Sequence, residues 1–309
     1  MARRRRGLPV NGVLLLDKPK GLSSNHALQR ARRLFQAQKA GHTGTLDPMA
    51  TGLLPVCFGE ATKFSAHLLT ADKVYRTRVE LGAVTETGDA EGEVVERLAV
   101  PVLAAADVEA VLESFRGEIE QVPPMYSALK HQGRRLYEIA REGGQVERPA
   151  RSINIFELQL QAQTPTSLSL YVHCSKGTYI RSLVSDIGER LGCGAHVDTL
   201  RRVSLGPFQD APMHSLHSLE ALAQREGVAA VEALLLPTDR GLSGWPVVTV
   251  AQEVVARFCQ GQAVATDSCE VGALVRVHDS AGELLGMGEV QQNLCVAPRR
   301  LLVQRPRQG

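Results

Sequence analysis

Residues 41–64 read GHTGTLDPMATGLLPVCFGEATKF, and this stretch decides how the chain around it is interpreted. A glycine-rich segment displays His42, two threonines and Asp47, and the apolar run at 53–59 then predicts a buried strand. Polar loops of this kind, set beside a rigid element, are frequent functional sites. Asp47 has no second acid nearby, although carboxylate enzymes usually employ two. The stretch therefore indicates either a structural turn or a catalytic loop with a single acid.

Asp47 also precedes Pro48, and this pair fits the start of a helix. Aspartate is a favoured N-cap residue, and proline is tolerated at the first helical position. Gly52 and Pro55 would interrupt such a helix within a turn or two. From these residues alone, both the helix cap and the catalyst remain open.

The chain on either side of this loop alternates between strands and helices. Before it, the sequence predicts a strand at 12–19 and a helix from Ser23 or Ser24 to Gly41. After it, we expect a helix at 59–72, a strand at 74–82, a helix at 100–117, strands at 153–161 and 167–177, a helix at 178–192 and an extended segment at 194–206. The mixture lacks regular βαβ units, so we predict an α+β fold.

Near residue 240 the character of the sequence changes. Short strands separated by turn residues are expected at 244–250, 261–266, 272–279, 283–290 and 299–304, with one helix at 251–261. We predict a second domain here, a small β-barrel.

Composition narrows the class of protein. The chain has 309 residues, enough for about two domains, of which 44% are hydrophobic and 22% charged. The six cysteines form no CxxC pair, which argues against zinc and redox chemistry and for a reducing cytoplasm. No apolar run approaches the length of a membrane span, and the N-terminus lacks the apolar core of a signal peptide. Phosphate-loop and dinucleotide motifs are also absent, so we expect a cytoplasmic protein without cofactor or metal.

Basic residues are clustered, although the net charge is only +2. Arginines fill positions 3–6, pairs stand at 32–33, 134–135, 201–202 and 299–300, and the basic segment 124–151 interleaves Tyr126 and Tyr137 with its charges. Separate patches of this kind suit a phosphate backbone, while a solvated surface is the alternative.

Arg181 occupies an unusual place in KGTYIRSL (176–183). A cation in the first turn of the predicted helix opposes the helix dipole, and a nearby carboxylate such as Asp47 would remove this objection. Alternatively, Arg181 is exposed and its stem covers apolar surface.

Three further side chains each admit two or more interpretations. Tyr75 and Tyr179 are either core residues or rings that stack on a planar ligand. His42 could act as a general base or as a wedge inserted into a ligand, and it lacks the spaced partners that a metal site requires.

Taken together, several motifs resemble the TruB family of bacterial tRNA pseudouridine-55 synthases. They are DKPKGLSS, GHTGTLDPMATGLLPVCFGEATKF, DKVYRTRVELG, TETGDAEG, PPMYSALKHQGRRLYEIAR and HCSKGTYIRSLVSDIGERLGCGAHVDTLRR, in this order. The resemblance runs from about residue 12 to about residue 303. It implies a disordered arm at 1–11, a mixed-sheet catalytic domain at 12–240 with an RNA-contacting insertion at 124–151, and a PUA-like RNA-binding domain at 244–306.

The resemblance also implies a role for individual residues. Asp47 matches the family's nucleophile, Arg181 the arginine that pairs with it, and Tyr75 the aromatic residue that stacks on the target base. Tyr179 and Leu200 match residues lining the pocket, and His42 matches the histidine that enters the RNA loop after the base has flipped out.

The implied activity is isomerisation of uridine 55 in the tRNA T loop, an RNA modification by a monomer without cofactor, metal or obligate protein partner. An RNA-binding protein with a purely structural Asp loop and a carboxylate-dependent nucleoside hydrolase are the competing hypotheses.

Overall fold

The computed structural model describes residues 7–209, 211–266 and 270–302. The predicted arginine arm at 3–6 lies outside these residues. The rest of the expected disordered arm is partly held in place, because Leu8 forms a β-bridge with Ala37 and donates its N–H to the carbonyl of Gln36 at 2.6 Å. Among the described residues, the helices are too short or too polar to cross a bilayer.

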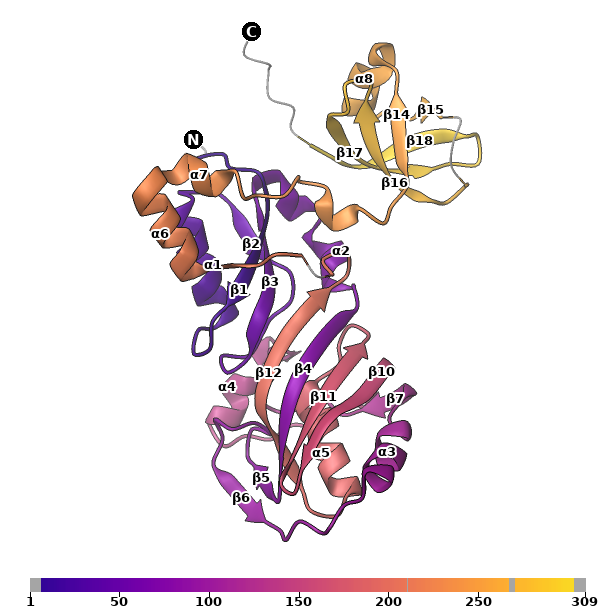
Figure 1. Cartoon of the computed structure of the whole chain (residues 1–309). Helices are drawn as coiled ribbons and strands as arrows, with labels where there is room; N and C mark the ends of the chain where they lie inside the picture. The colour runs from indigo at the N-terminus through magenta and orange to yellow at the C-terminus, as the bar shows by residue number, and fades with distance from the viewer. Residues whose placement is uncertain (1–6, 210, 267–269, 303–309) are drawn as a thin grey trace.

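A nine-stranded mixed sheet forms the body of the molecule. Its strands are β1 (Gly12–Lys18), β2 (Ala40–His42), β3 (Thr51–Phe58), β4 (Lys73–Leu81), β7 (Gly117–Gln121), β10 (Arg151–Thr164), β11 (Ser167–Cys174), β12 (Ala195–Leu205) and β13 (His214–Ser215). Their order is β13-β1-β3-β12-β4-β11-β10-β7, with β2 paired to β3 (Figure 1). Most pairs are antiparallel, whereas β1 with β13 and β3 with β12 are parallel.

Helices cover the two ends of this sheet. They are α1 (Ser24–Leu34), α2 (Ser65–Leu69), α3 (Ala105–Glu113), α4 (Leu136–Arg141), α5 (Ile180–Arg190), α6 (Leu216–Glu226) and α7 (Val228–Glu232). In Figure 1, α1 and α6 lie beside β1, while α3 and α5 lie beside β10 and β11. Two small hairpins, β5 (Ala83–Thr85) with β6 (Val94–Arg97) and β8 (Lys130–His131) with β9 (Arg134–Arg135), project from the body. The predicted α+β class with a mixed sheet is confirmed.

The strand β12 positions the centre of the molecule. It pairs with β4 so that Arg202 lies opposite Tyr75, and with β3 so that Arg202 also lies opposite Gly52. In β4 the side chains of Tyr75, Thr77, Val79 and Leu81 are buried, as the alternation of the sequence predicts. The strand that follows residues 43–50 is thereby linked through β12 to the strand that carries Tyr75.

Three predicted helices differ from the structure, and of these the helix expected at 100–117 is shorter, since α3 spans only Ala105–Glu113. The helix α1 ends at Leu34 instead of Gly41, because Gln36 takes a positive φ of 50° and Ala37 pairs with Leu8. The predicted helix at 59–72 is split into a 3₁₀ turn, η1 (Gly59–Lys63), and the short α2. Phe64 marks the split, since its buried ring packs with Leu242 and Met287 from later parts of the chain.

A five-stranded sheet forms the C-terminal unit. Its elements are β14 (Val247–Val250), α8 (Gln252–Cys259), β15 (Val264–Ala265), β16 (Leu274–Asp279), β17 (Leu284–Val290) and β18 (Cys295–Leu301), after the 3₁₀ turn η2 (Arg240–Leu242). The sheet curls around its own core in the order β14-β16-β17-β18-β15 (Figure 1). The last strand begins four residues earlier than expected, because Pro298 is accommodated at a register shift opposite Gly288.

Candidate active site

The loop at 43–50 is held by hydrogen bonds from its neighbours. Ser24 Oγ donates to the carbonyl of Leu46 at 2.9 Å and accepts from its N–H at 2.8 Å. The Lys18 ammonium and the Gly21 N–H both donate to the carbonyl of Pro48, at 3.2 and 2.8 Å. These contacts fix the backbone on both sides of Asp47.

The structure resolves the two interpretations of Asp47 in favour of a displayed side chain. Residues 45–47 have no regular secondary structure, bends follow, and β3 starts at Thr51, so no helix begins at Asp47 within this described segment. The carboxylate of Asp47 instead accepts a hydrogen bond from Arg181 Nε at 2.9 Å. The Asp47 side chain is 37% exposed and that of Arg181 is 4% exposed. An accessible carboxylate is thus oriented by a buried cation.

Arg181 is fully engaged by its surroundings. Its Nη1 donates to the carbonyl of Thr87 and its Nη2 to the carbonyl of Tyr126, each at 2.6 Å. A second carboxylate, Asp89, lies 3.6 Å from Nε. Arg181 sits in the first turn of α5, as predicted, and the two carboxylates offset the unfavourable helix dipole.

Asp89 is itself oriented by hydrogen bonds. Its Oδ1 accepts from Thr87 Oγ1 at 2.6 Å and from the N–H of Glu91 at 3.1 Å, and the residue is buried. The sequence placed Asp89 only within the motif TETGDAEG, without a role. The motif was the available signal, but which arginine the acid faces depends on the fold.

A cavity of about 320 Å³ opens beside Asp47. Of the predicted site residues, it brings together Asp47, Arg181, Tyr75, Tyr179 and Leu200. Its size falls in the usual range for small-ligand sites. Burial raises the pKa of the Tyr75 phenol, which a hydrogen bond with Arg202 partly opposes. Tyr75 therefore presents a neutral ring in the cavity near neutral pH.

Tyr179 reaches the cavity from the start of α5. It is the N-cap residue of this helix, while the preceding Thr178 donates its hydroxyl to the carbonyl of Ser175. The side-chain amide of Gln121 accepts from the Tyr179 N–H at 2.8 Å and donates to its carbonyl at 3.1 Å. This reciprocal pair fixes the backbone from which Tyr179 projects.

His42 lies outside this cavity, at the end of β2. It lines an adjoining cavity of about 700 Å³ that shares Asp47 and Arg181 with the first and also borders Arg135, Tyr137 and Arg141. Burial, assisted by the charge of Arg202, lowers the pKa of His42, and its Nδ1 is buried without a hydrogen-bond partner among the described residues. His42 is thus uncharged at neutral pH and contacts the site only from its rim.

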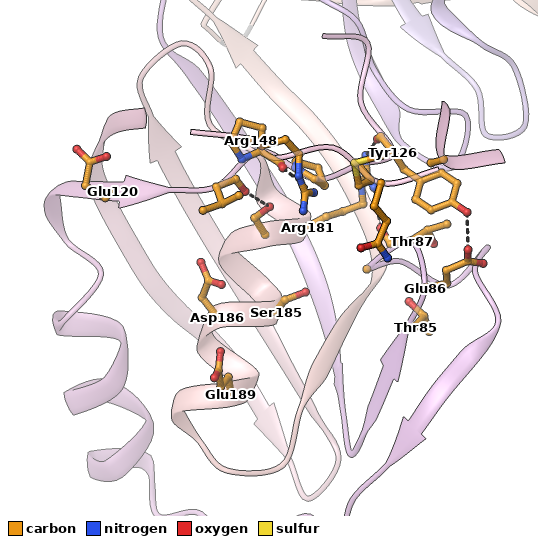
Figure 2. A pocket seen from close by; sticks show the side chains of 18 of the residues that line it. Thr85, Glu86, Thr87, Glu120, Tyr126, Arg148, Arg181, Ser185, Asp186 and Glu189 are labelled. Atoms are coloured by element: carbon orange, nitrogen blue, oxygen red, sulfur yellow. Dashed lines mark hydrogen bonds between the residues drawn. The ribbon is translucent and has the colours of Figure 1, made fainter. Parts of the chain in front are cut away.

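A third and larger cavity, of about 930 Å³, lies on the other side of Arg181. Figure 2 shows Glu120, Asp186 and Glu189 along its wall, with the hydrogen bond between Tyr126 and Glu86 at one edge. Asp47 and Tyr75 do not line it. The chemistry-bearing groups therefore belong to the smaller cavity, and Arg181 forms the partition between the two.

Three buried cations near Asp47 were missed by sequence reasoning. Lys18, Lys73 and Arg202 are almost completely buried, and the latter two line the cavity of Tyr75. Basic residues in strands give no local signal of burial. Throughout the described residues, no group of three or more His, Cys, Asp or Glu side chains is arranged to hold a metal ion.

Comparison with known proteins gives consistent matches along the chain. The family model described as TruB family pseudouridylate synthase (N terminal domain) matches residues 32–180. The models described as tRNA pseudouridylate synthase B C-terminal domain and Pseudouridine synthase II TruB, C-terminal, match residues 181–243 and 246–302.

Full-length relatives and solved structures agree with these matches. A protein of Chromohalobacter salexigens named tRNA pseudouridine synthase B is 57% identical, covering 98% of this chain and 97% of its own. A protein of Shigella boydii with the same name is 49% identical, covering 98% of each. A chain in the structure of an H/ACA RNP bound to a substrate RNA containing 2′-deoxyuridine shares the fold, with a TM-score of 0.73 and 23% identity over 99% of this chain and 92% of that chain.

Proposed function

This chain belongs to the TruB family of pseudouridylate synthases, and we propose that Asp47 performs its reaction on uridine 55 in the T loop of tRNA. The chain is an enzyme that isomerises uridine to pseudouridine in tRNA. The observation that supports the assignment of Asp47 is its ion pair with the buried Arg181 at the mouth of the Tyr75 cavity.

The reaction explains why a single acid suffices. Pseudouridine formation breaks the C1′–N1 bond and joins C1′ to C5 of the same base, without water, redox change or group donor. Asp47 attacks as a carboxylate, either at ribose C1′ or at the pyrimidine ring, and both routes require it charged and oriented. Arg181 supplies the orientation through its Nε, while its other nitrogens are fixed by backbone carbonyls.

The target uridine must leave its stack to reach Asp47. Flipping a base out costs a few kcal/mol, and contacts made by the flipped base and by the rest of the RNA offset this. We assign Tyr75 to stacking on the base, and Tyr179 and Leu200 to the walls around it, because the three share one cavity with Asp47. We assign His42 to filling the vacated position in the RNA loop, because it borders the adjoining cavity and is uncharged at neutral pH.

RNA backbone contacts fall to two regions in this proposal. The insertion at 124–151 contributes Arg135, Tyr137 and Arg141 to the cavity of about 700 Å³ that His42 lines. There the guanidinium of Arg141 lies over the Tyr137 ring. The C-terminal unit, 244–306, serves as the PUA-like RNA-binding module. We place the protein in the cytoplasm, acting on tRNA as a monomer.

The test is product analysis on a T-stem-loop transcript. The purified protein should convert the target uridine to pseudouridine with no change in RNA mass and no release of uracil, and a transcript with cytidine at this position is the control. Released uracil would establish a hydrolase instead. Binding of the RNA without any product would establish an RNA-binding protein.

A further inference from the structure

We propose that Lys73 and Arg202 form a cationic wall that stabilises the negative charge on the uracil base while it is detached from the ribose. The proposal rests on the proposed function. It adds two residues to the site, neither of which bonds to the side chain of Asp47 or Arg181.

Both side chains face the cavity that holds Tyr75. Lys73 stands two residues before Tyr75 on β4, and Arg202 lies opposite Tyr75 on β12, so the three project from the same face of the sheet. All three line the cavity with Asp47. A base that stacks on Tyr75 therefore lies within the field of both cations.

Neither cation forms an ion pair with a carboxylate within the described part of the chain, although the charge of Asp72 acts on Lys73. Arg202 is 1% exposed and donates from Nε to the carbonyl of Leu53 at 2.8 Å and from Nη2 to that of Gly44 at 3.1 Å. Lys73 is 8% exposed and donates to the carbonyls of Leu69 and Ala71, at 2.9 and 2.5 Å. These two bonds leave one of the three ammonium N–H donors without a described acceptor.

The contrast with Arg181 is the central observation. Arg181 faces two carboxylates, whereas Lys73 donates to carbonyl oxygens and Arg202 to carbonyl oxygens and the Tyr75 phenol. Lys18, completely buried and bonded to three carbonyls, adds a third cation behind the Asp47 loop. Of these four buried cations only Arg181 forms an ion pair with a carboxylate among the described residues, although the charges of Glu91 and Asp72 also act on Lys18 and Lys73.

Keeping such charges buried is costly for the fold. Burial is the main cause that lowers the pKa of Lys73 to about 8, with the charge of Arg202 adding to the effect. Buried cations without an anionic partner are rare in structural roles, whereas cations aimed at developing negative charge are a recurrent catalytic device.

The reaction supplies the missing negative charge. When the C1′–N1 bond breaks, its electron pair departs with N1, and the base becomes an anion delocalised over its ring nitrogen and carbonyl oxygens. If Asp47 has bonded to C1′ in place of N1, attack of C5 on C1′ breaks this ester bond and releases the Asp47 carboxylate, so the negative charge passes from the base back to Asp47. A proton then leaves C5 and N1 gains a proton, so that atoms and electrons balance. If Asp47 adds to the ring first, negative charge again develops on the base.

The variant Lys73→Gln tests this wall, because glutamine removes the charge and keeps two N–H donors on a shorter side chain. We would measure single-turnover rate constants at saturating enzyme on T-stem-loops with uridine or 5-fluorouridine at the target position. Fluorine withdraws electrons, so the fluorinated base needs less help in leaving. Conversion of each nucleoside would be followed after nuclease digestion.

The expected result is a loss of about 10²-fold in the rate with uridine, by analogy with removal of one oxyanion donor. The loss with 5-fluorouridine should be at least fivefold smaller. Lys73→Arg, which keeps the charge, should recover most of the rate. Lys39→Met, which removes an exposed lysine, should leave the rate constants with both substrates unchanged.

Equal losses for the two substrates, or no loss for uridine, would overturn the proposal, since a purely structural lysine affects both bases alike. The same comparison made with Lys73→Met gives an independent result should the glutamine variant fold poorly. Failure of the wild-type enzyme to form pseudouridine would contradict the proposed function, which is a different outcome from an unaffected Lys73 variant.

Discussion

Replacing Arg181 by lysine keeps the positive charge but removes the planar guanidinium that joins four groups. The Arg181 side chain donates to Asp47 at 2.9 Å and to the carbonyls of Thr87 and Tyr126, each at 2.6 Å, and its Nε lies 3.6 Å from Asp89. A lysine retains only a point charge and reaches no more than part of this set.

The size of the effect follows from the lost bonds. Hydrogen bonds to charged groups contribute about 1.5–3 kcal/mol each. Asp47 is 37% exposed, so solvent screens its attraction to Arg181 and the purely coulombic loss is at the lower end of this range. We expect about 3 kcal/mol less stabilisation of the transition state, which corresponds to about 10²-fold in rate.

The assay separates chemistry from binding. Single-turnover rates would be measured on a T-stem-loop well below the melting temperature of the variant, and affinity by filter binding. The rate should fall about 10²-fold with less than about a threefold change in Kd. Arg190→Lys, in the exposed last turn of the same helix, is the matched control. Equal losses in rate and affinity would refute this reasoning and identify Arg181 as a phosphate contact.

Three further outcomes follow from the same geometry. Asp89→Asn should lower the single-turnover rate about tenfold or more (about 1.4 kcal/mol) with RNA affinity unchanged, because the Arg181 guanidinium loses one of its two carboxylates. An unaltered rate would show that Asp89 does not orient Arg181. Gly52→Ala should lower the free energy of unfolding by about 3 kcal/mol, because the φ of Gly52 is +96° and a Cβ would lie 2.2 Å from the carbonyl oxygen of Arg202 on β12. Gly227→Ala is the control, since Gly227 has a φ of +87° with open space around it, and it should lower the free energy by about 1 kcal/mol. Similar melting temperatures of the two variants would contradict this expectation. Lys18 and Lys73 have pKa values of about 8 in the folded state against 10.5 in the unfolded chain, so above pH 8 the unfolded chain binds more protons than the folded one. The free energy of unfolding should therefore rise between pH 8 and 9, before ionisation of the thiols of Cys57 and Cys174 in the unfolded chain opposes the rise. A free energy of unfolding that stays constant across this range in urea denaturation would count against these pKa shifts.

Much of the fold was predictable because the burial pattern is local. The alternation in β4 indicates its buried face, and the apolar runs of β1 and β3 predict strands that the structure buries. The interrupted pattern after Asp47 argued against a helix there, and the structure has none in this segment. The contradicted helix at 59–72 failed because Phe64 packs against residues more than 170 positions later, which no local pattern records.

The site was predictable only in its motif residues. Asp47, Tyr75, Tyr179 and Arg181 stand in distinctive segments, and the fold gathers them in one cavity. By sequence, Arg202 is half of an arginine pair that suits a basic surface patch. The register of β12 with β3 and β4 instead buries it opposite Tyr75. Which charges are buried, and whether each has a partner, is decided by sheet order rather than by sequence spacing.

The central claim is that Asp47 alone supplies the carboxylate that attacks the uridine. Its most direct test is pseudouridine formation by Asp47→Asn in a T-stem-loop under single-turnover conditions. Asp17→Asn is the matched control, because Asp17 also pairs with an arginine, at 2.8 Å, and its side chain is 30% exposed. We predict RNA binding without detectable pseudouridine for Asp47→Asn, and turnover close to wild type for Asp17→Asn. Pseudouridine formed by Asp47→Asn at a rate near that of the wild type would contradict the assignment.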